Sequence, residues 1–256
     1  MPVRRSSVRS LSDDKMQNSE TNLKPGRWFI LPSWESLPEE LRTDAIRPYY
    51  DALAKHKAAL FFKRLFDVFA ALDLIIMLGI PMLIIAIMIK CDSKGPVFFR
   101  QERVTTYGAK FRIHKFRTMV NNADKIGTAV TVDNDSRITK VGAKLRDLRL
   151  DEFPQLFDVL AGNMSFVGTR PEVVKYVVRY TDEMNATLLM PAGITSIASI
   201  EYKDEAELLE KAEDADEVYV NDILPEKMKW NLKSVKEFGF FKDIGVLFKT
   251  VGAVLK

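Results

Sequence analysis

The sequence predicts an α-rich α/β fold that is attached to one side of a membrane by a single re-entrant helix, and is therefore monotopic. Three observations support this prediction. Apolar residues recur at helical spacing over much of the chain, segments 97–99 and 110–117 have the composition of strands, and the run from Leu74 to Ile89 carries no charge. We expect a small sheet in one main domain, with amphipathic helices in the membrane interface near both ends.

The composition bounds the possible classes of protein. The 256 residues carry a mild net charge of +3, which does not demand a nucleic-acid partner. Cys91 is the only cysteine in the sequence, so an intrachain disulfide and a zinc site built on cysteines are excluded. This usage indicates a reducing compartment. The polar N-terminus has no apolar segment of the kind that a secretory signal requires.

Two segments are predicted before the apolar run. Residues 1–26 are polar and rich in Ser, Asn and Lys, so we expect a disordered tail. Residues 27–60 are expected to form an N-terminal helical segment. Ser36 has the context of an N-cap, because acidic residues follow in the first turn, and a helical pattern runs from there towards Lys63.

The apolar run lies within residues 61–90, the predicted membrane segment. It is about 16 residues long, or about 24 Å as a helix, whereas a full span needs about 20 residues and about 30 Å. Pro81 lies near its middle and removes a helical hydrogen bond, so a bend is expected there. Lysines and arginines flank both ends, which favours placing both flanks on the cytoplasmic side.

A short apolar helix that is bent by a proline, with both ends on one side, is a re-entrant helix that enters one leaflet and returns. Two other interpretations remain open, because runs of this length are ambiguous. One is a tilted full span, and the other is a buried core helix of a soluble protein. Labelling a cysteine on each flank with an impermeant reagent separates the hairpin from the full span.

The chain changes in character after the apolar run. Gly95-Pro96 indicates a turn, Val97–Phe99 a short strand and Gln101–Gly108 a polar connection. Lys110–Arg117 alternates basic and apolar residues with a period of two, which predicts a half-buried strand with a basic face. A solvated face without a function is the plain alternative for this charge pattern.

Local patterns predict the remaining elements. They are a loop at 121–135, helices at 140–150 and 156–160, a strand at 164–167, a turn at 168–171, a helix at 172–184, a turn at 191–194 and an acidic solvated helix at 204–217. Gly162 ends the second helix by the usual C-terminal glycine rule. From Lys227 onward, aromatic residues interleave with lysines, which suits a helix at a membrane surface. A core helix is the alternative.

Asp151 and Glu152 are the candidate catalytic residues. Neighbours on a helix point about 100° apart, so the two carboxylates cannot share one proton but can divide two tasks. An aspartate is ionised at neutral pH and can attack phosphorus without a base. Attack on a sugar-diphosphonucleotide would form an acyl phosphate and release a nucleoside monophosphate, while Glu152 would hold Mg²⁺ on the diphosphate. Taken alone the pair is a weak signal, because most such pairs are solvated.

Cations strengthen this hypothesis. Four of them come from separate places in the sequence and could converge on two phosphates: Lys115, Arg117, Arg146 and Arg170. A guanidinium group presents a planar fork that suits phosphate oxygens. Gly168 permits close approach of the backbone beside Arg170. Salt bridges to surface acids are the alternative, which spacing does not exclude.

Six motifs follow one another along the chain. They are Lys63-Arg64-xx-Asp67, Gly95-Pro96-Val97-Phe98-Phe99-Arg100-Gln101, Lys115-Phe116-Arg117-Thr118-Met119, Asp135-Ser136-Arg137-Ile138-Thr139, Leu150-Asp151-Glu152-Phe153-Pro154-Gln155-Leu156 and Met164-Ser165-Phe166-Val167-Gly168-Thr169-Arg170-Pro171. With these six motifs in this order, the chain resembles members of the bacterial sugar transferase family, and among them the small monotopic phosphoglycosyl transferases. The resemblance covers residues 60–200 and extends more weakly to the C-terminus.

The resemblance implies an activity. Members transfer a sugar 1-phosphate from a nucleotide sugar, usually a UDP-sugar, to polyprenyl phosphate, commonly undecaprenyl phosphate, and release UMP. It also implies a re-entrant membrane helix, a Mg²⁺-dependent site and a ping-pong mechanism that initiates a surface glycan. By matched position, Asp151 is the expected nucleophile that becomes a phosphosugar adduct, and Glu152 is its metal-linked partner. The four cations named above are the expected phosphate site.

Three places depart from the family pattern. Thr169 stands where the family commonly has Pro, which affects the rigidity of that turn but not Arg170. Ile80-Pro81 stands where a Ser-Pro break is common, so the serine bond that helps the bend is absent. Residues 191–200 differ from the usual segment that begins Pro-Gly-Ile-Thr-Gly, so the sugar is not inferred.

We therefore expect residues 91–256 to form a cytosolic catalytic domain with C-terminal interfacial helices, on the cytoplasmic face of a bacterial inner membrane. The expected partners are a UDP-sugar, polyprenyl phosphate, the lipid bilayer and downstream glycosyltransferases, with no nucleic acid. An inactive membrane-attached scaffold of a glycan assembly complex is one alternative, and UMP release would exclude it. A soluble nucleic-acid-binding protein that uses the basic strand around Lys115 is another, and solubility without detergent would favour it.

Overall fold

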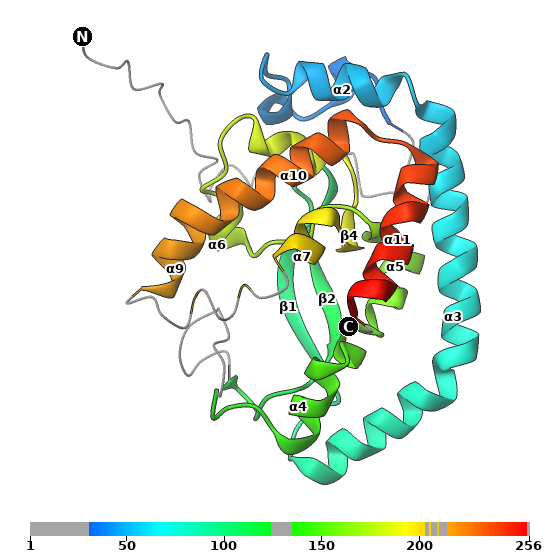
Figure 1. Ribbon diagram of the computed structural model, residues 1–256, viewed down its shortest axis with the longest axis vertical. Helices are drawn as coiled ribbons and strands as arrows, with labels where there is room; N and C mark the ends of the chain where they lie inside the picture. The colour runs from blue at the N-terminus through cyan, green and yellow to red at the C-terminus, as the bar shows by residue number, and fades with distance from the viewer. Residues whose placement is uncertain (1–30, 124–134, 203–204, 206–208, 210–213, 255–256) are drawn as a thin grey trace.

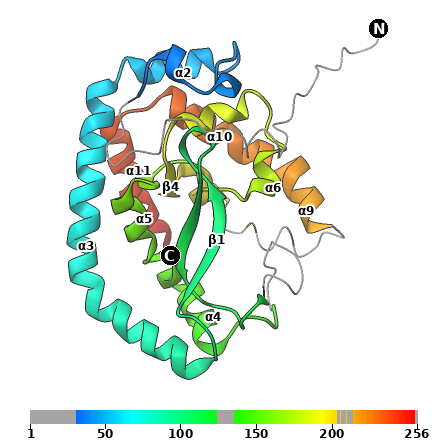
Figure 2. The same ribbon diagram turned by 180° about the vertical axis from the view of Figure 1, so that it is seen from behind.

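The computed structural model describes residues 31–123, 135–202, 205, 209 and 214–254 (Figure 1). These residues are rich in helix, and their strands form two small sheets of two strands each. The long helix α3 (Lys57–Asp92) runs along one side of the molecule, as the opposite views of Figures 1 and 2 show. The predicted tail at 1–26 lies outside the described residues.

The segment before α3 is broken into short pieces, so the predicted helix from Ser36 towards Lys63 is wrong. The pieces are the 3-10 turns η1 (Trp34–Ser36) and η2 (Glu39–Leu41) and the helix α2 (Arg47–Ala54). Pro38 lacks the N–H that a helix through it would need. His56, with φ of −117°, separates α2 from α3. The apolar residues of this segment, such as Leu53, nevertheless enter the largest core cluster.

Helix α3 contains the whole predicted membrane segment. Its 36 residues include Pro81, and Figure 1 shows that the helix bends, as that proline predicts. Among the described residues, α3 is the helix that is long and apolar enough to cross a membrane, yet only 17% of its most apolar window is buried. The interpretation as a buried core helix is therefore wrong, because protein covers little of it. The choice between a re-entrant helix and a full span stays a prediction.

The strands β1 (Phe98–Val104) and β2 (Lys110–Phe116) form an antiparallel hairpin, with Phe98 opposite Phe116. The predicted strand at 110–117 is confirmed, and its apolar residues are buried. The predicted connection at 101–108 is wrong in its first half, because β1 continues to Val104. Polar side chains line β1 because one face of the hairpin is exposed. This polar composition is also typical of a loop, and for that reason the sequence predicted a connection here.

The elements around the candidate carboxylates agree with their predictions. They are α4 (Lys140–Asp147), α5 (Gln155–Ala161) and β3 (Met164–Val167), and the 3-10 turn η5 (Leu150–Glu152), which no pattern predicted, joins the two helices. Gly162 adopts φ of 90° after α5, which confirms the predicted C-terminal cap. Of the loop predicted at 121–135, residues 124–134 lie outside the described part of the chain.

The turn predicted at 191–194 is wrong, because these residues enter a strand. β4 (Ala192–Thr195) pairs in parallel with β3, and Met164 lies opposite Ala192. A Cβ atom on Gly193 would lie only 2.1 Å from the Gly168 nitrogen. Gly193 therefore allows two backbones to approach closely and does not mark a turn.

The helix predicted at 172–184 is wrong over most of its length. The structure contains the short helix α6 (Val174–Val177) and then the 3-10 helix η6 (Met184–Leu189). Several valines occupy this stretch, and β-branched residues lose side-chain freedom in a helix. The helical spacing of apolar residues was therefore a poor guide here.

The C-terminal part is helical. Its elements are α7 (Ile197–Glu201), α9 (Ala215–Val218), the π-helix η7 (Tyr219–Ile223), α10 (Leu224–Lys236) and α11 (Phe240–Val254). Most of the acidic helix predicted at 204–217 lies outside the described residues. Helix α10 buries Met228 and Val235 in the core, whereas α11 exposes Phe241 and Phe248. The core and surface interpretations of this region thus apply to different helices.

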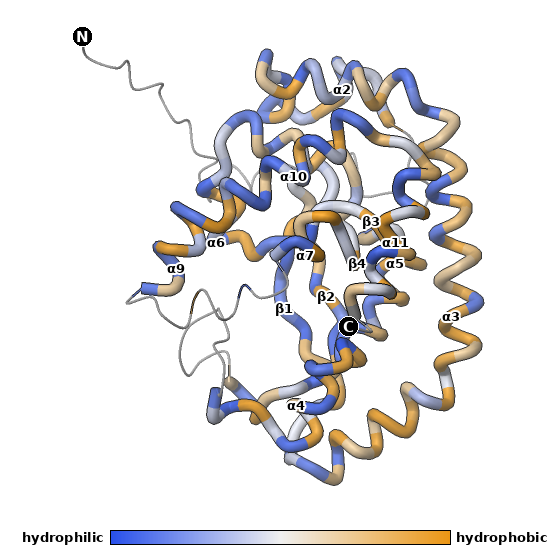
Figure 3. The backbone as a smooth tube through the Cα atoms, viewed as in Figure 1, coloured by the Kyte–Doolittle hydropathy of each residue, from blue (hydrophilic) through white to orange (hydrophobic). Residues whose placement is uncertain are grey.

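Two apolar clusters attach the elements of the candidate site to α3. Ala71 of α3 joins β2, α5 and β3 in one cluster, with Val159 and Met164 among its fully buried members. Further along α3, Ile85 and Ile89 pack on Phe116 of β2 and on Leu145 of α4. The C-terminal part of α3 is strongly hydrophobic (Figure 3). These contacts bring the ends of β2, η5 and β3 together beside an apolar helix.

Candidate active site

Asp151 and Glu152 lie in η5, the single turn that joins α4 to α5. Neighbours in a 3-10 turn point about 120° apart, so the two carboxylates diverge as they would on an α-helix. Arg149 directly precedes the turn with φ of 52° and ψ of 24°. This left-handed conformation costs a residue other than glycine about 1–2 kcal/mol. The backbone is thus strained at the point where it presents the carboxylates.

Glu152 is the centre of a buried ion-pair cluster. Its side-chain oxygen Oε1 accepts a hydrogen bond of 2.8 Å from the Lys115 ammonium and one of 2.6 Å from the Arg170 guanidinium. Lys115 comes from β2, and Arg170 follows β3. Glu152 is only 9% exposed. Three segments that are distant in sequence therefore meet at one carboxylate oxygen.

The cluster shifts the pKa values of its members in a consistent way. Burial alone raises the pKa of Glu152, but Arg170 and Lys115 outweigh it and hold this pKa well below its ordinary value. Glu152 in turn raises the pKa of Arg170. Burial lowers the pKa of Lys115, against the attraction of Glu152. Glu152 is therefore a permanent anion between two cations.

Asp151 has a different environment from its neighbour. Burial raises the pKa of Asp151, Lys115 opposes this shift, and the negative charge of Glu152 adds to it. Arg146 and Arg170 lie close enough to lower the same pKa slightly. Cations therefore surround Asp151 without a direct hydrogen bond to it among the described residues. A carboxylate in this situation keeps its lone pairs available as a nucleophile.

Three of the four predicted cations are near the carboxylates, and the fourth is not. Lys115 and Arg170 contact Glu152, and Arg146 acts on Asp151 through its charge. Arg117 is 5% exposed and donates instead to the Ser93 carbonyl, at 2.7 Å, at the end of α3. The structure thus places Arg117 at a helix terminus and does not bring it into the ion-pair cluster.

A pocket of about 600 Å³ opens beside Glu152. Two acidic residues, Asp147 and Glu152, and two arginines, Arg149 and Arg170, line its charged part. Apolar residues from α3, α5, β4 and α11 line the rest: Leu74, Leu78, Leu156, Ile194, Leu247 and Val251. The pocket therefore has one charged end and apolar walls, and one of these walls belongs to the predicted membrane helix.

Sequence reasoning did not assign some residues that the structure places here. Arg149 belonged to a basic run, but nothing in the sequence signals its left-handed backbone. The pocket walls from α11 were also missed, because they come from a helix about 100 residues after the carboxylates. The hydroxyl groups of Thr195 and Thr250, 2.8 Å apart, join β4 to α11 at this wall. Only tertiary contact reveals these residues.

His114 has a packing role beside the site. The Asp158 carboxylate accepts from the His114 backbone N–H at 2.8 Å and lies 2.8 Å from the ring Nδ1. This double contact ties β2 to α5. Lys115 is the next residue on β2, so the tie also fixes the strand that delivers Lys115 to Glu152.

Glu152 is the candidate ligand for Mg²⁺. Within the described part of the chain, no three His, Cys, Asp or Glu residues gather as a metal cage. Mg²⁺ is commonly held by one or two carboxylates together with substrate phosphates and water, so a cage is not required. Both cations contact Oε1 of Glu152, which leaves Oε2 as the oxygen available to a metal. The residues present fit a metal that binds together with a diphosphate.

Comparison with known proteins gives consistent matches. The family described as "Bacterial sugar transferase" matches residues 58–256. The chain is 35% identical over 198 residues to UDP-N-acetylgalactosamine-undecaprenyl-phosphate N-acetylgalactosaminephosphotransferase of Aeromonas hydrophila, which covers 76% of this chain and 44% of that protein. It is 34% identical over 229 residues to UDP-glucose:undecaprenyl-phosphate glucose-1-phosphate transferase of Klebsiella pneumoniae, covering 87% of this chain and 46% of that protein.

A third match has a similar length. The chain is 34% identical over 193 residues to the uncharacterized sugar transferase EpsL of Bacillus subtilis, covering 75% of this chain and 87% of that protein. The chain thus spans less than half the length of the first two relatives but most of the third. All three matches include the segment that holds the two carboxylates and their cations.

Proposed function

The chain belongs to the bacterial sugar transferase family, and from this premise we propose that it transfers a sugar 1-phosphate from a UDP-sugar to polyprenyl phosphate, with undecaprenyl phosphate as the expected carrier. The first two relatives named above act on UDP-sugars and undecaprenyl phosphate by their names. The product would be the lipid-linked sugar on which downstream glycosyltransferases build a surface glycan.

The observation that carries this proposal is the position of Glu152, next to Asp151 in η5, at the charged end of a largely apolar pocket. Arg170, Lys115 and Arg149 supply the positive charge that a phosphate group needs. The apolar walls suit an isoprenoid chain, which gains about 0.8 kcal/mol for each methylene removed from water. A site for a soluble substrate alone would have no need of such walls.

We propose that Asp151 is the nucleophile. Its carboxylate oxygen forms a bond to the phosphorus that carries the sugar, and the bond from that phosphorus to the bridging oxygen breaks, so UMP leaves with the electron pair. The second half reverses the roles. A phosphate oxygen of polyprenyl phosphate attacks the same phosphorus, the bond to Asp151 breaks, and the carboxylate is regenerated with polyprenyl-diphosphate-sugar as the product.

The cations have distinct tasks in this scheme. Arg170 and Lys115 hold Glu152 ionised and lie where negative charge develops on the transferred phosphate. Arg146 and Lys115 favour the ionised form of Asp151 against burial. We assign Mg²⁺ to Glu152 and the diphosphate oxygens, where the metal would neutralise the charge of the leaving group. Arg117 is proposed only for the attachment of α3.

The exposed apolar surface supports the proposed membrane placement. Large apolar side chains of α3 are open to the surroundings, for example Ile76 at 72% and Ile80 at 73%, and Phe241 of α11 is 84% exposed. Such a surface is costly in water and favourable in lipid. We propose a re-entrant α3 with the domain on the cytoplasmic face of a bacterial inner membrane, where UDP-sugars are found.

The test is a screen of UDP-sugars for UMP release by purified protein in detergent, with undecaprenyl phosphate and Mg²⁺. We expect at least one UDP-sugar to give UMP in proportion to lipid-linked product. Asp151→Asn is the matched control, since it keeps the shape of the side chain and removes the nucleophile. Absence of release with every sugar would favour the inactive scaffold. Full release by Asp151→Asn would remove the covalent route.

A further inference from the structure

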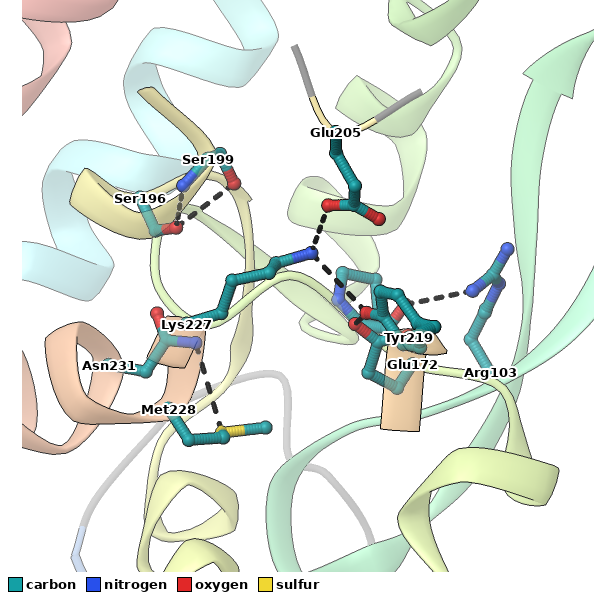
Figure 4. Close-up of polar contacts among 10 residues, drawn as sticks. Arg103, Glu172, Ser196, Ser199, Glu205, Tyr219, Lys227, Met228 and Asn231 are labelled. Atoms are coloured by element: carbon teal, nitrogen blue, oxygen red, sulfur yellow. Dashed lines mark hydrogen bonds and ion pairs between the residues drawn. The ribbon is translucent and has the colours of Figure 1, made fainter. Parts of the chain in front are cut away.

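A second buried polar network lies behind the Arg170 segment (Figure 4). The Lys227 ammonium donates to the Glu205 carboxylate at 2.7 Å and to the Tyr219 hydroxyl at 3.3 Å. The Tyr219 hydroxyl donates its proton to the Glu172 carboxylate at 2.5 Å. Lys227, Tyr219 and Glu172 are each less than 9% exposed. These hydrogen bonds therefore run in one direction, from Lys227 through Tyr219 to Glu172.

Tyr219 is fixed by contacts that do not involve its hydroxyl. Its ring centroid lies 4.7 Å from that of Tyr176, and the Lys227 ammonium lies 5.1 Å from the ring centroid. Tyr219 also begins the π-helix η7, a rare distortion that is frequent at functional sites. Loss of the hydroxyl alone would therefore leave the ring in place.

Glu172 is linked to Arg170 by a rigid stretch of backbone. Pro171 stands between them, and its ring restricts φ. The Pro171 carbonyl accepts from Arg103 at 3.2 Å, and the Glu172 carbonyl accepts from the Val104 N–H at 3.0 Å. Both anchors lie on β1. With the backbone held in this way, the direction of the Arg170 side chain depends on the charges that compete for it.

Glu172 is such a competitor. It is a buried carboxylate two residues from Arg170, and its charge adds to that of Glu152 in raising the Arg170 pKa. A buried carboxylate without partners would attract a nearby guanidinium strongly. The Tyr219 hydroxyl, which accepts from Lys227, gives Glu172 another partner, and Arg170 is found on Glu152, at 2.6 Å.

We propose, on the basis of the proposed function, that Tyr219 is a positioning residue for sugar-phosphate transfer. Its hydroxyl accepts a hydrogen bond from Lys227 and donates one to Glu172. The Arg170 guanidinium therefore stays in contact with Glu152 and remains available to the donor diphosphate. Removal of the hydroxyl frees Glu172 to draw Arg170 away from the site. The C-terminal helices, which are distant in sequence from the carboxylates, thereby act on the reaction through one hydrogen bond.

The test compares two tyrosines of the same aromatic pair. Tyr219→Phe should lower kcat/KM for the UDP-sugar about 10-fold, because Arg170 is diverted. Tyr176→Phe is the matched control. It also loses one hydroxyl bonded to a carboxylate, that of Asp216 at 2.5 Å, but this bond does not touch the Arg170 segment. It should keep the wild-type kcat/KM. Equal losses in both variants would reduce Tyr219 to a structural role and overturn the proposal.

Rescue by a second substitution separates positioning from packing. In Tyr219→Phe/Glu172→Gln the rival charge is gone, so kcat/KM should return to within about 3-fold of wild type. A structural role would instead give losses that add. Failure of rescue would overturn the proposal.

A structure of Tyr219→Phe is informative whether or not the wild type releases UMP. Arg170 turned towards Glu172 would support the positioning role, and Arg170 still on Glu152 would overturn it. Absence of UMP release by the wild type would refute the proposed function alone, because the position of Arg170 is read from the structure.

Discussion

Asp151 and Glu152 are neighbours in the chain, yet their surroundings shift their pKa values in opposite directions. Arg170 and Lys115 overcome burial and lower the pKa of Glu152, whereas burial raises that of Asp151. Two carboxylates with divergent environments are suited to different tasks. On this account Glu152 remains charged throughout turnover, and Asp151 is the group whose ionisation limits activity at low pH.

Substitution of Lys115 tests this assignment through the pH profile. Asp151 must be ionised to attack, so activity is lost as pH falls through its pKa, which burial places above the ordinary value. Lys115 lowers that pKa, so Lys115→Gln should move the acid limb of kcat/KM to higher pH. Lys110→Gln, on the same strand but paired with Glu102, is the control and should leave the limb unchanged. An unmoved limb in Lys115→Gln would contradict the assignment.

Arg149 combines a charge in the pocket with a strained backbone, and two substitutions separate these properties. Arg149→Gly and Arg149→Ala both remove the charge, so both should raise KM for polyprenyl phosphate to a similar extent. Glycine accepts φ of 52° without strain, so Arg149→Gly should be more stable than Arg149→Ala by about 1 kcal/mol. Unfolding in detergent measures the difference. Equal stability would show that the conformation costs nothing.

At the scale of elements, the predictions that succeeded rest on local signals. The alternation in β2 and the glycine after α5 are properties of a few neighbouring residues. The failures at β4 and in the second half of β1 have tertiary causes, namely close backbone approach and an exposed hairpin face. The failure at α6 has a local cause, its valine-rich composition. Among the site residues, Lys115 and Arg170 were found from motifs. The place of Arg117 depends on where α3 ends, which no local pattern reveals.

Gly193 provides a prediction about the β3–β4 pair. A Cβ atom there would collide with the Gly168 backbone at 2.1 Å, so Gly193→Ala should lower the free energy of unfolding by about 1–3 kcal/mol. It should also lower activity, because Gly168 begins the segment that carries Arg170. Gly245→Ala, in an exposed part of α11 with no atom within 4 Å, should be neutral or stabilising. Similar effects of both substitutions on chemical unfolding would contradict the close approach.

At the scale of the whole molecule, α3 would link the proposed membrane placement to the chemistry. Its outward side chains are exposed and apolar, and its inward residues Leu74 and Leu78 line the pocket beside Glu152. A lipid substrate could therefore reach the charged end of the pocket without leaving an apolar environment. Composition and hydropathy predicted the helix, but its contact with the pocket depends on the arrangement of four elements.

The course of α3 in the membrane can be tested with single cysteines in a Cys91→Ser background. Lys57→Cys and Lys94→Cys place one thiol on each flank of the helix. A re-entrant helix predicts that an impermeant maleimide labels both in inside-out vesicles and neither in intact cells. Labelling of the two positions from opposite sides would establish a full span instead.

The central claim is that Asp151 itself carries the sugar phosphate between donor and lipid. Intact-protein and peptide mass spectrometry after incubation with the active UDP-sugar and Mg²⁺, without polyprenyl phosphate, tests it most directly. We predict a mass increase equal to one sugar phosphate on the peptide that contains Asp151, lost on addition of undecaprenyl phosphate and absent in Asp151→Asn. Turnover of the UDP-sugar with no adduct, or an adduct that persists in Asp151→Asn, would contradict the claim.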